Sequence, residues 1–340
     1  GTGDDVDVYF SLCDVTLTPA VGTDPPELTS ACDPPIRANT TTDQAQLNPT
    51  LAVSTSAGLL VLAWEDWSPY GEGIEPWNLS GIRYRMFDLD GRATTDFATD
   101  RLANFSTDDV QAEPSVAVLD SGDFIIAWSD ASGAAVDSDG FEVRTRIFDA
   151  AGDPTTADDF VVNLARMTYE QYEPTTAPVE APVPGFLVAW TSMEDLGRLT
   201  IRANFVQATG IVTATTETTL PSSASGNQFA PTAAADNSTP TGTVVAVVWT
   251  AEPVPVPDGA MTGIVGVQVA IGCADCELMV LSADDVLLNT TFPDVQETPA
   301  AAFGPGGSLA LVWTDWSGAD GSGGLNEVRA RYLPHGWVLE

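Results

Sequence analysis

Residues 111–128, QAEPSVAVLDSGDFIIAW, contain the pattern that determines the fold. A Gln-x-x-Pro tetrapeptide opens a segment of alternating apolar residues, Ser-Gly-Asp follows it, and a near-continuous apolar run then ends in tryptophan. Short alternating segments on either side of a glycine turn predict two antiparallel strands. The continuous apolar run indicates that the second strand is covered on both faces. We therefore looked for further copies, because an internal repeat determines the whole architecture.

The pattern occurs five times, at Gln46/Pro49, Gln111/Pro114, Gln171/Pro174, Gln228/Pro231 and Gln296/Pro299. Each copy leads to one tryptophan, in order Trp64, Trp128, Trp190, Trp249 and Trp313, at separations of 18, 17, 19, 21 and 17 residues. A third run with paired arginines follows, as in Ile82–Phe87 and Val143–Phe148, and a weaker fourth run leads to the next copy. We expect the five tryptophans to be buried at equivalent positions.

Four short strands per unit, spaced 57 to 68 residues apart, are typical of propeller blades. We predict an all-β chain forming a single β-propeller over residues 1–340, with five blades of four antiparallel strands and six blades as the alternative count. A β-sandwich pair is the alternative architecture. The predicted repeat units are 46–110, 111–170, 171–227, 228–295 and 296–340, and residues 1–45 form a closing half-blade.

The two ends of the chain complement each other in this repeat. Val6–Leu12 has the character of a third strand, and Ile36–Asn39 matches the fourth strand that precedes the next Gln-x-x-Pro. Residues 296–340 supply strands one to three. We therefore predict that the N-terminal segment closes the ring against the C-terminal blade, although one third strand is then left over.

The charge excludes several classes of partner. The chain carries 48 acidic and 12 basic residues, a formal net charge of −36, and all the basic residues are arginine. Such a surface repels nucleic-acid phosphates and anionic lipid headgroups, so we expect no nucleic-acid binding. No apolar run reaches the roughly 18 residues of a membrane span, so we expect no membrane insertion. The start at Gly1 carries no signal peptide, which indicates a processed or recombinant N-terminus if the protein is exported.

Four cysteines indicate an oxidising compartment. We predict two disulfides, Cys13–Cys32 and Cys273–Cys276, each local to one strand-turn-strand unit. A zinc site would need all four sulfurs from distant segments, and a redox Cys-x-x-Cys would need a helix that the sequence does not show. These cysteines favour an extracellular or cell-surface location.

The combination of Gln-x-x-Pro, Gly-x-apolar-x-x-x-Trp and Arg-x-Arg-x-Phe-Asp-x-x-Gly resembles tandem repeats of large secreted or surface bacterial proteins. The resemblance covers residues 46 to 340 and implies an architecture, because such repeats share no catalytic residues. The fourth copy departs from it, since Val265–Val269 lacks arginine.

Seven arginines lie in third strands, at Arg83, Arg85, Arg144, Arg146, Arg202, Arg329 and Arg331. Sialidase-like propellers bind a sugar carboxylate with arginines, but those come from unlike positions converging on the ring axis. Repetition at one position instead favours a structural task, such as a contact between blades or stacking on tryptophan.

The loops between second and third strands vary most, and scaffolds commonly place recognition on such loops. Exposed aromatics flanked by Asp and Gly bind sugars or proteins, and we predict a ligand site at Trp67, Tyr70, Trp77 and Trp316. The alternative is that these side chains plug the closure seam. Asp137 and Asp139 have the alternating oxygens of a calcium loop, although a solvated acidic turn is the other interpretation. We therefore expect no cofactor, with calcium as the alternative.

Five Asn-x-Ser/Thr sequons, at Asn39, Asn78, Asn104, Asn237 and Asn289, are candidate glycosylation sites.

For function, we expect a non-catalytic extracellular module that presents its variable-loop rim to a glycan or a protein. One alternative is a building block of a surface layer or filament that self-associates through its termini by strand addition. Another is a glycoside hydrolase or lyase with carboxylates converging at the axis. Acidic residues are too abundant for the sequence to single out a catalytic pair. A Ser-His-Asp triad would depend on His335 near the C-terminus, which is implausible.

Overall fold

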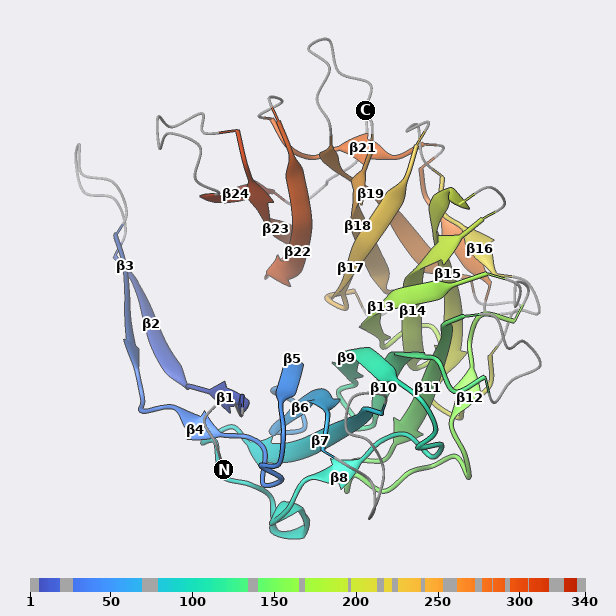
Figure 1. Ribbon diagram of the computed structural model, residues 1–340. Coiled ribbons are helices and arrows are strands. Elements are labelled where there is room, and N and C mark those ends of the chain that lie inside the picture. Colours follow the sequence, from blue (N-terminus) through green and yellow to red (C-terminus); the bar gives the residue numbers. More distant parts are fainter. Residues whose placement is uncertain are drawn as a thin grey trace.

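The computed structural model describes residues 6–18, 27–68, 79–133, 140–164, 169–194, 197–212, 217–221, 226–239, 242–252, 262–272, 277–282, 284–290, 294–304, 306–317 and 327–334. These residues form an all-β, five-bladed propeller of antiparallel sheets (Figure 1), as the repeat predicts. The one helical element among them is a short 3₁₀ turn, Thr95–Phe97. None of their helices has the length and apolarity to cross a membrane.

The strands follow the chain in blade order. The N-terminal segment contributes β1 (Tyr9–Phe10), β2 (Cys13–Thr18), β3 (Glu27–Cys32) and β4 (Ile36–Arg37). Blade 1 consists of β5 (Gln46–Ser54), β6 (Leu59–Asp66), β7 (Gly81–Asp88) and β8 (Arg101–Leu102). Blade 2 consists of β9 (Gln111–Val118), β10 (Phe124–Asp130), β11 (Glu142–Phe148) and β12 (Phe160–Val161). Blade 3 consists of β13 (Gln171–Val179), β14 (Gly185–Met193), β15 (Leu199–Gln207) and β16 (Thr218–Thr219). Blade 4 consists of β17 (Gln228–Asp236), β18 (Val244–Ala251), β19 (Gly263–Ile271), β20 (Leu278–Val280) and β21 (Val286–Leu287). Blade 5 consists of β22 (Gln296–Gly304), β23 (Ser308–Asp315) and β24 (Glu327–Leu333).

Each blade is a meander whose first strand lies nearest the centre of the arc (Figure 1). In blade 1, Gln46 pairs with Asp66, so the start of the first strand lies beside the end of the second. In blade 2, Gln111 pairs with Asp130 in the same way. The Gln-x-x-Pro motifs therefore lie at the end of each blade from which the variable loops leave.

The core lies between blades. Trp64, Trp128, Trp190 and Trp249 are fully buried and Trp313 is nearly so, which confirms their predicted burial. One cluster packs Ile82 and Tyr84 of blade 1 against Phe124 and Trp128 of blade 2. Because both faces of a second strand meet such clusters, its apolar run is continuous.

The repeated arginines connect strands and blades. Arg83 forms an ion pair with Asp100, which directly precedes the fourth strand of its blade (Nη1–Oδ1 3.1 Å), and Arg202 pairs likewise with Glu217 (3.0 Å). Arg146 donates from Nη1 to the carbonyl oxygen of Ala103 in the preceding blade (3.0 Å). These contacts give the arginines a structural task.

Three of the candidate glycosylation sites have a different role. Asn104 is buried, its Oδ1 accepts a hydrogen bond from the Ile82 amide (2.8 Å), and its Nδ2 donates to Oε1 of Gln111 in the next blade (3.1 Å). Asn39 and Asn289 are buried in the same arrangement, with Gln46 and Gln296. A glycan has no room at a buried, fully bonded amide. We call this arrangement the Asn–Gln latch.

The remaining two sequons differ. Asn237 is half-buried, with Oδ1 accepting from the Thr243 hydroxyl (2.5 Å). Asn78 lies outside the described residues.

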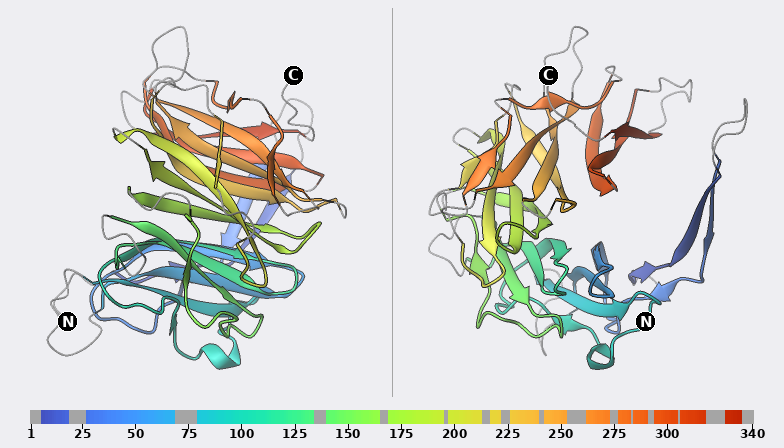
Figure 2. Two further views of the ribbon diagram at one scale, coloured as in Figure 1. Left: turned by 90° about the vertical axis from the view of Figure 1, so that its right-hand side faces the viewer. Right: turned by 180° about the vertical axis from the view of Figure 1, so that it is seen from behind.

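The N-terminal segment packs on blade 1, where Val8 and Ala38 contact Leu60, Leu62 and Trp64. The predicted disulfide Cys13–Cys32 is present and joins β2 to β3 in a ribbon that stands apart from the blades, on the open side of the arc (Figures 1 and 2). Among the described residues, no strand of this segment pairs with β22, β23 or β24. The predicted closure of the ring by this segment is therefore not observed.

Candidate active site on the propeller axis

Every blade has a β-bulge in its first strand, at the Gln-x-x-Pro motif. The pairing register shifts there, as between Leu47 and Thr50 in blade 1. The residue before the proline has a positive φ in each blade: 47° at Asn48, 54° at Glu113, 54° at Glu173, 52° at Ala230 and 51° at Thr298. This left-handed conformation is uncommon for residues other than glycine, and bulges with such backbone are frequent beside active sites. The bulges thus place these five residues around one cavity.

The five bulges surround an open cavity of about 500 Å³. Its lining consists of the bulge residue and the following proline from every blade, together with Thr50. Since all five blades contribute, the cavity lies on the axis. It also opens at the end of the ring from which the second-to-third-strand loops leave.

Three glutamates of successive blades are linked by hydrogen bonds at or beside this cavity. Glu113 and Glu173 belong to the lining, and Glu65 at the end of β6 accepts hydrogen bonds from Asn48 Nδ2 (2.7 Å) and the Glu113 amide (2.7 Å). Glu113 Oε2 accepts from the Glu173 amide (2.8 Å). Each carboxylate thus holds the bulge of the next blade.

Hydroxyl groups complete the arrangement at two of these carboxylates. Ser129 Oγ donates to Glu113 Oε2 (2.8 Å), and Thr191 Oγ1 donates to Glu173 Oε2 (2.9 Å). Both donors directly follow the blade tryptophan, so the fold fixes their positions.

Burial distinguishes Glu113 electrostatically. Desolvation raises the pKa of Glu113 above its ordinary value, and the nearby negative charges of Glu173 and Glu65 raise it further. The hydrogen bonds from Ser129 and the Glu173 amide act in the opposite direction and offset part of this increase. A carboxyl group whose pKa is raised beside a second carboxylate is a candidate general acid.

Two predicted aromatic residues lie next to this carboxylate group. Trp67 Nε1 donates to Glu65 Oε2 (3.2 Å), and Trp316 Nε1 donates to Glu297 Oε1 (2.9 Å), immediately before the lining residue Thr298. Trp316 remains 41% exposed. Tyr70 and Trp77 lie outside the described residues, so the predicted four-residue aromatic site remains a prediction.

The other predicted sites also fall outside the described residues: the calcium loop at Asp137 and Asp139, and the Cys273–Cys276 disulfide. Within the part of the chain that the structure describes, no three His, Cys, Asp or Glu side chains gather as a metal site requires.

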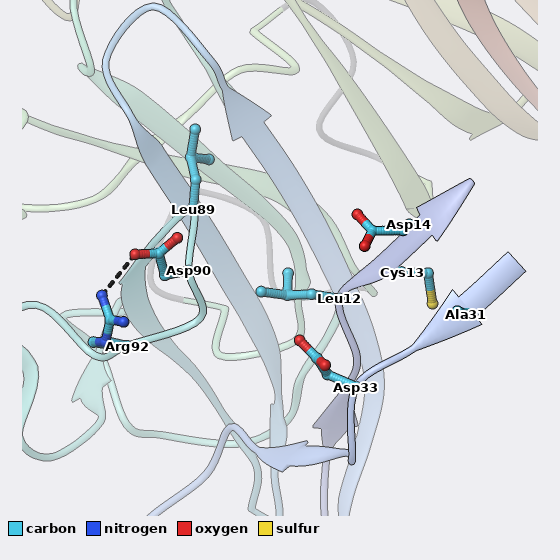
Figure 3. Close-up of a pocket in the computed structure, with 8 residues that line it drawn as sticks. All are labelled: Leu12, Cys13, Asp14, Ala31, Asp33, Leu89, Asp90 and Arg92. Atoms are coloured by element: carbon cyan, nitrogen blue, oxygen red, sulfur yellow. Dashed lines mark hydrogen bonds and ion pairs between the residues drawn. The ribbon is translucent and has the colours of Figure 1, made fainter. Parts of the chain in front are cut away.

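A second hollow, of about 510 Å³, lies at the base of the N-terminal ribbon (Figure 3). Leu12, Asp14 and Asp33 line it from the ribbon side, and Asp90 and Arg92 line it from the turn after β7. Arg92 forms an ion pair with Asp90 (2.6 Å), and both side chains are exposed. The carboxyl groups that line this hollow in the described part of the chain are exposed, whereas Glu113 is half-buried, so the axial cavity is the better candidate for catalysis.

Comparisons with known proteins find solved structures with a similar fold. No family model matches the sequence, and no curated protein matches it. An α-L-arabinanase of Penicillium chrysogenum, solved with arabinobiose, is 12% identical and aligns over 99% of each chain with a TM-score of 0.52. The Hadza microbial sialidase Hz136 is 10% identical over 92% of this chain with a TM-score of 0.51, and the chain spans 64% of that protein's length. A protein of unknown function from Dyadobacter fermentans is 13% identical with a TM-score of 0.50 and aligns over 85% of this chain and 78% of its own.

These comparisons correct the functional expectation. The predicted non-catalytic binding or structural module is wrong, since two of the similar solved structures are named as an arabinanase and a sialidase. The alternative of a glycoside hydrolase agrees better with them.

The sequence does contain a signal for the axial carboxylates, but it is difficult to recognise among 48 acidic residues. When the five motifs are aligned, the residue before proline is Asn48, Glu113, Glu173, Ala230 or Thr298. The residue before the proline thus varies within the repeated motif, and it is a glutamate in only two blades. Their convergence on the axis depends on the bulge, which the sequence does not show.

Proposed function

We propose that this protein is a glycoside hydrolase whose active site is the axial cavity. The observation that carries the proposal is Glu113, a half-buried carboxyl group with a raised pKa and with Glu65 and Glu173 on either side. Glycoside hydrolysis requires one carboxyl group that protonates the leaving oxygen and a second that acts as base or nucleophile. Glu113 would be the acid, and Glu65 or Glu173 the second group.

The substrate would be a neutral glycan. Among the described residues, no arginine lines the cavity, and third-strand arginines such as Arg83, Arg146 and Arg202 are engaged in contacts within and between blades. The chain carries a net charge of −36, so an acidic sugar would be repelled without a cationic partner. The arabinanase with a similar fold was solved with arabinobiose, a neutral sugar, which supports this class.

The aromatic side chains would hold the sugar. Trp67 and Trp316 are each hydrogen-bonded to a glutamate at or next to the cavity, and a sugar ring stacks favourably on an indole face. The disulfide and the acidic surface support secretion, where a polysaccharide substrate would be met.

The test is turnover on a panel of neutral oligosaccharides, including linear arabino-oligosaccharides, by the full chain and by Glu113→Gln. Loss of a general acid should lower kcat by about 10²- to 10⁴-fold. Glu180→Gln is the matched control, because burial also raises the pKa of Glu180, but its carboxylate bonds the Asp120 amide away from the axis. Absence of turnover by the unmodified chain on every glycan, or equal turnover by Glu113→Gln, would refute the proposal.

A further inference from the structure

The two ends of the arc expose apolar faces that are buried at the equivalent positions of the other blades. In every blade the second-strand tryptophan pairs with one third-strand residue, for example Trp64 with Arg83 and Trp313 with Arg329. The residue before that partner is fully buried in blades 1 to 4, where it is Ile82, Val143, Ile201 and Ile264. In blade 5 it is Val328, which is 79% exposed.

The same face of blade 5 is exposed along its length. Tyr332 is 67% exposed, whereas Met86 at the equivalent position in blade 1 is buried. Val312, on the neighbouring strand β23, is 39% exposed. In blade 1 this face is covered by the first and second strands of blade 2, including Val116 and Trp128. The first two strands of a following blade would therefore cover the exposed face of blade 5.

The other end of the arc has the complementary exposure. Leu51 and Val53 on β5 are 51% and 49% exposed, whereas Val116 and Val118, their equivalents on β9, are 6% and 5% exposed. Val116 and Val118 are covered by β6 of the preceding blade, through Leu59, Val61 and Ala63. No such strand precedes β5 among the described residues.

The N-terminal segment forms the outer half of that preceding blade. The Val8 amide donates to Asn39 Oδ1 (2.9 Å), and the Ala38 amide donates to the Val8 carbonyl (2.8 Å). In blade 1, Ile82 makes the same two contacts with Asn104 and Ala103, at 2.8 Å and 2.7 Å. β1 is thus a third strand and β4 a fourth strand. Third strands of the blades also pair with a second strand, whereas β1 pairs only with β4 within the described residues.

We infer that this opening is the binding site for one β-hairpin, built like the first two strands of a blade, which completes a sixth blade. Its second strand would pair with the free edge of β1. One face would cover Val312, Val328 and Tyr332, and the other would cover Leu51 and Val53. All five Gln-x-x-Pro and Trp hairpins of residues 1–340 already lie in blades, so the occupant is an additional polypeptide segment of this pattern.

The probe is a copy of residues 101–131, fused through a Gly-Ser linker after residue 340 of the full chain. It carries a fourth strand, Asn104, and the hairpin with Gln111 and Trp128. We expect the fused probe to raise the melting temperature by at least 5 °C and to slow hydrogen exchange of the β1 amides at least tenfold. The same segment as a free peptide should give this protection in trans, so the result does not depend on the fusion.

Two sets of controls isolate the site. A probe with Gln111→Ala and Trp128→Asp should give no stabilisation. In the full chain, Val328→Asp should abolish the gain, whereas Ile211→Asp, at a 55% exposed apolar residue of blade 3, should preserve it.

The inference is overturned if neither form of the probe protects β1, or if Val328→Asp and Ile211→Asp behave alike. It is also overturned if the unmodified chain sediments as a dimer with β1 already protected, because a second copy would then occupy the opening.

Discussion

Replacing Asn104 with alanine should destabilise the junction between blades 1 and 2. The Asn104 side chain accepts from the Ile82 amide (2.8 Å) and donates to the Ser106 carbonyl and to Gln111 Oε1 (3.1 Å). The substitution leaves the Ile82 amide and the side-chain oxygen Oε1 of Gln111 without this partner. The site is buried, since Asn104 is only 2% exposed. A buried polar group left unsatisfied costs about 1–3 kcal/mol. Two such groups give an expected loss of about 2–6 kcal/mol in the free energy of unfolding.

The assay is urea denaturation followed by tryptophan fluorescence, with Ser106→Ala as the matched control. Ser106→Ala removes the glycosylation sequon but keeps the carbonyl that Asn104 bonds, so the free energy of unfolding should change by less than about 0.5 kcal/mol. A loss below about 1 kcal/mol for Asn104→Ala, or equal losses for both variants, would refute the assignment of Asn104 as a structural latch.

Further predictions concern pH, packing and the disulfide. Burial raises the pKa of Glu113 and Glu142, so their contribution to stability is complete below the ordinary carboxyl value of about 4 and is lost as the pH rises through the raised values. The urea midpoint should therefore be higher at pH 5 than at pH 7, and an equal or lower midpoint would contradict this. Trp128→Ala should lower the free energy of unfolding by about 3–5 kcal/mol in urea denaturation, because the indole is fully buried between blades. A loss below about 1 kcal/mol would show that neighbouring side chains fill the space left by the indole. Reducing Cys13–Cys32 should speed hydrogen exchange in β2 and β3 while changing the melting temperature of the blades by less than about 2 °C, since this ribbon stands apart from them. A larger shift would show that the ribbon supports the ring.

Local patterns predicted most of the blades. The spacing from Gln111 to Trp128 encodes two strands and a turn, and the apolar run before the tryptophan encodes burial on both faces, so strand identity and tryptophan burial follow from residues close in sequence. The Cys13–Cys32 pairing follows likewise, because both cysteines lie in one hairpin.

The site depends on contacts that local patterns do not encode. Glu65 and Glu113 lie 48 residues apart and meet only because a bulge in one blade bonds a carboxylate of the blade before it. The sequon at Asn104 has the same chemistry whether the amide is exposed or buried, and only the packing of two blades distinguishes a glycosylation site from a latch. The predicted closure by joining two half-blades is not observed among the described residues, where β1 pairs with β4 and blade 5 has its own third strand in β24.

The most direct test of whether the axial carboxylates cleave a neutral glycan is a crystal structure of Glu113→Gln with a neutral oligosaccharide that the unmodified chain hydrolyses. We expect sugar in the axial cavity, with a glycosidic oxygen within hydrogen-bond distance of residue 113 and a second carboxylate, Glu65 or Glu173, facing the sugar. Sugar bound away from the axis, in a variant that has lost turnover, would contradict it.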